Sequence, residues 1–119
     1  MNPKINTLKE IIEKLDLKVI SEGSDLNRAV EYGCCCDLLS WVMAHGKKDA
    51  VWITVQAHIN VVAVASLLEL AGVILASGVT MEEKAIEKAR EEGITILSSE
   101  LDAFELAGRL YEMGIGMKS

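Results

Sequence analysis

Aromatic residues and proline are scarce in this sequence. Its 119 residues include two Trp, two Tyr, one Phe and one Pro. Half of the residues are hydrophobic, mostly aliphatic, and this excludes a disordered chain, which has too few apolar side chains to form a core. A chain of this length buries roughly two-thirds of its unfolded surface in one core. We therefore expect residues 1–119 to form a single domain.

Positive charge and long apolar runs are also in short supply. Twelve Lys and Arg stand against eighteen Asp and Glu, and the basic residues are scattered along the chain. Nucleic-acid binding needs a concentrated basic face, so no nucleic-acid partner is expected. No apolar run reaches the roughly 18 residues of a membrane helix, and no signal-peptide pattern opens the chain. The sequence therefore predicts a cytoplasmic protein without membrane contact.

Common cofactor motifs are missing as well. The sequence contains no G-x-G-x-x-G, G-x-x-x-x-G-K-[ST] or H-E-x-x-H pattern, so no motif indicates a dinucleotide, P-loop or zinc-protease site. The three cysteines, Cys34, Cys35 and Cys36, are adjacent, which does not suit a disulfide framework. Neighbouring residues on a strand point to opposite faces, so only Cys34 and Cys36 share one. Iron–sulfur clusters need about four thiolates at wider spacings.

We therefore expect the cysteines to be reduced, small packing residues, with no metal and no cofactor. The alternative is an iron–sulfur cluster or zinc ion that Cys34 and Cys36 bind together with the same residues of a second subunit.

A strand, helix and strand pattern dominates the middle of the chain. Residues 50–55 are β-branched and aromatic, 60–70 are apolar on almost every side, and 73–76 are apolar again. Strands without apolar and polar alternation are usually covered on both faces, and a helical crossover joins parallel neighbours. The strands expected from residue 30 onward are 30–36, 50–55, 73–76 and 94–98. The predicted fold is a single α/β domain with a mostly parallel central sheet of four to five strands flanked by helices.

The N-terminal part is expected to add one helix and one strand. Thr7 and Glu10 form a capping-box pattern before a helix over 7–15, and 17–22 alternates as a strand. Too few residues separate this strand from the next for a parallel crossover. We therefore expect it to be antiparallel to its successor or to lie outside the main sheet.

Three later helix starts carry cap signals. We expect Asp37 to cap a helix over 38–44, and Thr80 with Glu83, then Asp102 with Glu105, to repeat the capping pattern.

Polar residues follow the predicted strands where ligands bind in open parallel sheets, beyond the carboxyl ends. These residues are Asp37, Ser40, Gln56, His58, Asn60, Ser77, Gly78 and Ser98. We expect them to lie along one edge of the sheet and to bind a small ligand. A purely local capping role is the alternative for Asp37, and a capping or packing role is the alternative for His58. His58 invites a catalytic interpretation, but no Ser or Cys nucleophile can be paired with it, so catalysis is not expected.

Two long segments, 36–78 and 93–115, resemble the DRTGG domain family. The most specific parts are the Asp37-Leu38-Leu39-Ser40 turn, and the Trp52-Ile53-Thr54-Val55-Gln56 strand with His58 and Asn60 behind it. The literal motif that names the family is absent. The resemblance implies an accessory domain. Family members accompany CBS domains in regulated pyrophosphatases, where they contribute to dimer contacts, and they are similar in layout to the N-terminal domain of HPr kinase.

Small stand-alone members of the family are found beside hydrogenase genes, and some carry names that suggest iron–sulfur binding. We expect a non-catalytic regulatory or ligand-sensing domain that forms a homodimer and binds a small, nucleotide-like molecule. The first alternative is a redox or iron–sulfur accessory protein with a hydrogenase-related partner. The second is a small enzyme that uses His58. Core packing is the default expectation for Trp41, Trp52, Met43 and Met113, and an apolar subunit contact is the alternative for each.

Overall fold

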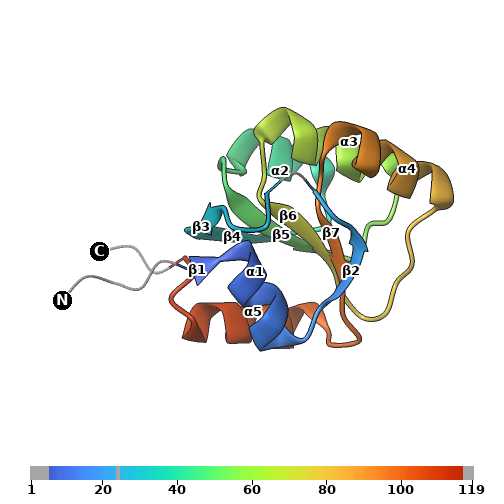
Figure 1. Cartoon of the computed structure of the whole chain (residues 1–119). Coiled ribbons are helices and arrows are strands. Elements are labelled where there is room, and N and C mark those ends of the chain that lie inside the picture. Colours follow the sequence, from blue (N-terminus) through green and yellow to red (C-terminus); the bar gives the residue numbers. More distant parts are fainter. Residues whose placement is uncertain (1–5, 24, 117–119) are drawn as a thin grey trace.

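A five-stranded sheet forms the centre of the molecule (Figure 1). The computed structural model describes residues 6–23 and 25–116. The strands of this sheet are β2 (Lys18–Ser21), β4 (Tyr32–Cys35), β5 (Ala50–Thr54), β6 (Gly72–Leu75) and β7 (Ile96–Ser98). Their spatial order is β2-β7-β6-β5-β4, with β4 to β7 parallel and β2 antiparallel to β7. The predicted mostly parallel sheet of an α/β domain is confirmed.

Helices cover both faces of this sheet (Figure 1). In the described part of the chain they are α1 (Leu8–Leu15), α2 (Leu39–His45), α3 (Ile59–Leu68), α4 (Glu83–Glu92) and α5 (Ala103–Glu112). Helices α2, α3 and α4 pack on one face, and α1 and α5 on the other. No helix in residues 6–23 and 25–116 is both long and apolar enough to cross a membrane. A separate antiparallel pair joins β1 (Asn6–Thr7) to β3 (Ala29–Val30).

Strand β5 shows why its sequence lacks alternation. All five of its residues are buried, with Trp52 in the core under α2 and α3, and Val51 and Ile53 in the core under α1 and α5. The indole Nε1 of Trp52 donates to the Cys36 carbonyl at 2.8 Å, so its one polar atom is satisfied inside the core. Trp52 is therefore a core residue, as the default expectation had it, and it is not available as a subunit contact.

The position of β2 corrects the expectation for the first strand. It belongs to the main sheet and is antiparallel to β7 at the far edge, not to its successor in the chain. The ten residues 22–31 can span roughly 33 Å, whereas four strand spacings amount to about 19 Å. This connection is therefore long enough to cross the sheet. The expected strand over 30–36 is also divided, because Val30 pairs with β1 and only 32–35 pair with β5.

The cap predictions succeed at two of four helix starts. Thr7 and Glu10 form the expected reciprocal box, and the Asp102 carboxylate accepts from the Glu105 amide at 2.9 Å. Helix α4 begins later than predicted, with Glu82 as its N-cap and no side-chain cap bond. Met81 is buried in the core just before this start. Met81 and Thr80 therefore both precede the helix.

A glycine pair offers a test of this packing. A Cβ at Gly23 would lie 2.6 Å from the Gly93 carbonyl oxygen and would also strike Thr95, whereas one at Gly108 would meet nothing within 4 Å. Gly23→Ala should therefore lower the free energy of unfolding by about 1–3 kcal/mol. Gly108→Ala, in the middle of α5, should raise it by up to about 1 kcal/mol. Urea denaturation of both variants measures this, and equal effects would contradict the close approach at Gly23.

Candidate functional site

The carboxyl ends of the parallel strands reach a common edge of the sheet. The hydrogen-bond ladder continues past the strands, because the Ala76 amide donates to the Thr54 carbonyl and the Ser99 amide to the Leu75 carbonyl, both at 3.0 Å. The residues that follow β5, β6 and β7 are thereby held side by side. This polar edge is called the rim below, and it consists of the eight residues predicted above to bind a ligand.

Asp37 joins two strand ends within the rim. Its Oδ1 accepts from the Thr54 hydroxyl at 2.7 Å and from the Val55 amide at 2.9 Å. The Thr54 hydroxyl in turn accepts from the Gln56 amide at 3.0 Å. The prediction that Asp37 caps α2 is wrong, since the N-cap is Leu38 and no side chain bonds to the first turn. Its carboxylate is drawn instead to the end of the neighbouring strand.

Ser77 and Gly78 form a tight turn after β6. Both have positive φ, 59° and 69°, and their amides donate to the carbonyls of Leu101 and Ser99 in the loop after β7. A Cβ at Gly78 would lie 2.8 Å from a carboxylate oxygen of Glu100, so glycine serves both the backbone conformation and this close approach. Ser98, the last residue of β7, is half-buried.

His58 and Asn60 lie at the start of α3. His58 is the N-cap, and its Nδ1 accepts from the Asn60 amide at 3.1 Å. Asn60 also lines a cavity of about 290 Å³ between α2 and α3, together with Met43 and Leu67. Ser40 is exposed in the first turn of α2. The rim residues therefore share one edge, but six of the eight are exposed, and they line a surface more than a deep pocket.

Two cavities flank β4, and the sequence did not indicate them. The first holds about 340 Å³ on the α2 face, and the second about 260 Å³ between β4 and α5. Both are lined by Gly33, Cys34, Cys35 and Gly116. Their existence depends on β4 being the last strand of the sheet, which the order of elements in the chain does not reveal.

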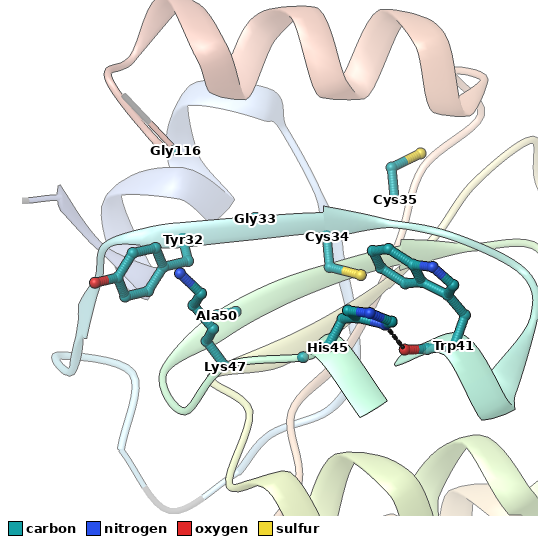
Figure 2. Close-up of a pocket in the computed structure, with 10 residues that line it drawn as sticks. Tyr32, Gly33, Cys34, Cys35, Trp41, His45, Lys47, Ala50 and Gly116 are labelled. Atoms are coloured by element: carbon teal, nitrogen blue, oxygen red, sulfur yellow. Dashed lines mark hydrogen bonds between the residues drawn. The ribbon is translucent and has the colours of Figure 1, made fainter. Parts of the chain in front are cut away.

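The first cavity combines aromatic rings with a cation (Figure 2). The rings of Trp41 and His45 stack with centroids 4.1 Å apart, and Nδ1–H of His45 donates to the Trp41 carbonyl at 3.0 Å. Lys47 Nζ lies 4.6 Å from the centroid of the Tyr32 ring. The i, i+4 spacing of Trp41 and His45 was a usable signal, whereas Lys47 had no partner that sequence could identify.

The sequence model of the DRTGG domain matches residues 10–113. This chain belongs to the DRTGG domain family. A structure of the CBS and DRTGG domains of the regulatory region of Clostridium perfringens pyrophosphatase, complexed with the activator diadenosine tetraphosphate, has a TM-score of 0.74 to this DRTGG domain. Sequence identity is 17%, and the match covers 92% of this chain and 47% of that chain, so the likeness concerns the fold. No protein of curated function matches.

In this DRTGG domain, the surroundings of Cys34 and Cys35 favour the neutral form of these two thiols. Burial, followed by the neighbouring Cys36 and Cys35, raises the pKa of Cys34 from 9.0 to about 11. Burial and the Asp37 carboxylate also raise the pKa of Cys35. Thiolates, not thiols, attack electrophiles and bind metals. Residues 6–23 and 25–116 contain no group of three His, Cys, Asp or Glu side chains that could hold a metal ion.

Removing the Asp37 carboxylate tests its role at the strand ends. Asp37→Ala leaves the Thr54 hydroxyl and the Val55 amide without their acceptor and should lower the free energy of unfolding by about 1–2 kcal/mol. Asp37→Asn keeps one acceptor oxygen and should cost clearly less. Urea denaturation measures the free energy of unfolding of both variants. If Asp37→Asn lowers it as much as Asp37→Ala does, the negative charge and not the acceptor oxygen stabilises the strand ends.

The raised thiol pKa predicts slow alkylation of Cys34. In a Cys35→Ser, Cys36→Ser chain, burial remains as the largest cause of the shift, so the thiolate should form only well above pH 9.0. The rate of iodoacetamide labelling should still be rising at pH 10 in the folded chain, after it has levelled off in urea. Because the unfolded thiol ionises first, the folded state should also lose stability as pH rises above about 9. A folded labelling curve that levels off near pH 8 would contradict the assignment.

Proposed function

We propose that this DRTGG domain is a non-catalytic, cytoplasmic regulatory domain that senses a small nucleotide-like ligand and self-associates. Family membership supports the regulatory role, as does the likeness to the regulatory region of a pyrophosphatase that was complexed with a dinucleotide activator. The observation that carries the proposal is the convergence of four parallel strand ends on one polar edge, the usual ligand position in such sheets.

Within the rim, some groups remain available to a ligand. The side-chain amides of Gln56 and Asn60 and the Ser77 hydroxyl are exposed, and no hydrogen bond of theirs contributes to the loops described above. The start of α3 lies next to them. His58 already accepts the Asn60 and Val61 amides there, and the positive end of the helix dipole favours phosphate or carboxylate. The ligand would thus place an anionic group near Asn60 and polar groups near Gln56 and Ser77. Asp37, Ser40, His58, Gly78 and Ser98 complete the proposed site and shape its loops.

An iron–sulfur accessory protein with a hydrogenase-related partner is the second candidate. One observation favours it: Cys34 and Cys36 are both half-buried and pack with the α2-face core, so two chains could supply four thiols from equivalent faces. Anaerobic reconstitution with iron and sulfide, followed by metal analysis and absorbance, separates the two functions. Two or more irons retained per dimer, and lost in Cys34→Ser, would favour this candidate over ligand sensing.

Ligand sensing is tested by thermal denaturation with AMP, ADP, ATP and diadenosine tetraphosphate. A nucleotide present at about 100 times its dissociation constant should add about 2.7 kcal/mol to the free energy of unfolding. Gln56→Ala, Asn60→Ala and Ser77→Gly should each weaken binding by about tenfold, the value of one net hydrogen bond. Glycine at position 77 removes the hydroxyl and still accepts the positive φ.

Ser66→Ala is the matched control for these variants. The Ser66 hydroxyl lies in the second half of α3 and bonds to Glu92 at 3.0 Å, so its removal should leave nucleotide affinity unchanged. If nucleotides bind, but only Ser66→Ala lowers their affinity and the three rim variants do not, the rim is not the binding site. If no nucleotide in the panel raises the melting temperature, the nucleotide-like ligand itself is wrong.

A further inference from the structure

The two edges of the sheet are protected very differently. At one edge, β2 carries Lys18 and a register shift between Val19 and Ser21, features that hinder pairing with another chain. At the other edge, β4 has the sequence Tyr-Gly-Cys-Cys, with no charge, no proline and an unbroken register along β5. Edge strands of this kind are suited to further pairing.

The outer side of β4 offers hydrogen-bonding groups from two residues. The Cys36 amide donates to the Ile53 carbonyl at 3.2 Å, so residues of even number bond inward to β5, and Gly33 and Cys35 point their backbone groups outward. The Glu31 carbonyl is already occupied by the Gly116 amide at 3.1 Å. Since β4 ends the sheet, the outward groups of Gly33 and Cys35 meet no strand among the described residues.

Apolar grooves border this edge on both faces. They are the two cavities described above, and Trp41 on one side and Tyr111 on the other remain 47% and 59% exposed. Figure 2 shows Cys34 pointing toward Trp41 and His45, and Cys35 pointing to the opposite face. An added strand would place its alternate side chains in the two grooves, as in β-strand addition.

The edge is complementary to itself. In an antiparallel pair, residues whose backbone groups point outward lie opposite each other. A two-fold axis at Cys34 places Gly33 of each copy opposite Cys35 of the other. All the available outward N–H and C=O groups then form hydrogen bonds.

The ends of β4 carry both signs of charge in this register: Glu31 of each copy comes near Asp37 of the other, and Lys47 at the same end offsets these carboxylates. Lys47 stands beside Tyr32 at one end of β4, and the exposed Asp37 follows its other end. The two-fold axis brings Lys47 of each copy toward Asp37 of the other.

We infer that β4 pairs with β4 of a second copy of this chain, antiparallel about a two-fold axis at Cys34, which makes one continuous sheet of two domains. This inference rests on the self-association proposed above and names its surface. Trp41 and Tyr111 of each copy then cover the grooves of the other. The two Cys34 residues face each other as a pair without hydrogen bonds, with Cα atoms about 4.5 Å apart, within the range of a disulfide.

Analytical ultracentrifugation over a range of concentrations tests the surface. The wild-type chain should sediment at twice its 12.9 kDa mass. Gly33→Pro removes an outward N–H that β5 does not use, and edge strands tolerate such a proline. Cys35→Lys places a charge on the apolar edge. Each should raise the dimer dissociation constant by at least about tenfold. Leu67→Lys, an exposed apolar residue of α3 away from the edge, is the matched control and should remain dimeric.

Cross-linking tests the register. A chain with Cys34 alone (Cys35→Ser, Cys36→Ser) should form a covalent dimer when diamide accepts the two electrons and two protons of the paired thiols. A chain with Cys36 alone should not, because its thiols are offset by about 14 Å along the strands. Circular dichroism and melting temperature establish that each variant is folded.

The outcomes are distinguishable. A monomeric wild-type chain overturns both self-association and this interface, and leaves β4 open to an extended segment of another protein. If the dimer dissociation constant is unchanged by Gly33→Pro and Cys35→Lys, or if the dimer cross-links through Cys36 and not Cys34, this interface alone is overturned. Nucleotide binding is measured separately and is unaffected by either result.

Discussion

The parallel pairing of β5 with β6, buried on both faces, is the constraint on which the rest of the structure depends. Strands whose every residue is buried must lie in the middle of the sheet, so the less apolar β2 and β4 take the edges. The same pairing sends the ends of β5 and β6 to a common side, where their loops meet. Both the rim and the open edge thus follow from the placement of two central strands.

Most polar groups at the strand ends already form hydrogen bonds within the protein that hold its loops in place. The Asp37 carboxylate ties β4 to β5, the turn at Ser77 and Gly78 bonds to the loop after β7, and His58 caps α3. These bonds fix the loops at the positions where Gln56 and Asn60 are presented. A rim held in this way is largely preformed, which would reduce the entropy cost of binding the proposed ligand.

The sequence predicted the parts of the fold that are determined locally. Unbroken apolar runs identify central strands. Thr7 and Asp102 mark helix starts, because each caps its helix through a hydrogen bond to the residue three positions later. It could not predict where β2 joins, because ten connecting residues reach either edge. It also could not show that Asp37 would bond to Val55 across a strand, or that Lys47 would meet Tyr32, since such contacts depend on strand order.

The properties of the cysteine run suit the position of β4 at the edge of the sheet. Thiolates at Cys34 and Cys35 would put negative charge along β4, and like charges directly opposite across a strand pair are destabilising. Thiols are already neutral at physiological pH, and burial raises the pKa of both further above it, so this strand behaves as small apolar residues with a glycine among them. Glycine and neutral cysteine allow close approach of a second backbone, whereas larger or charged side chains would hold it away. Neutral, small side chains are therefore what makes this edge suited to association.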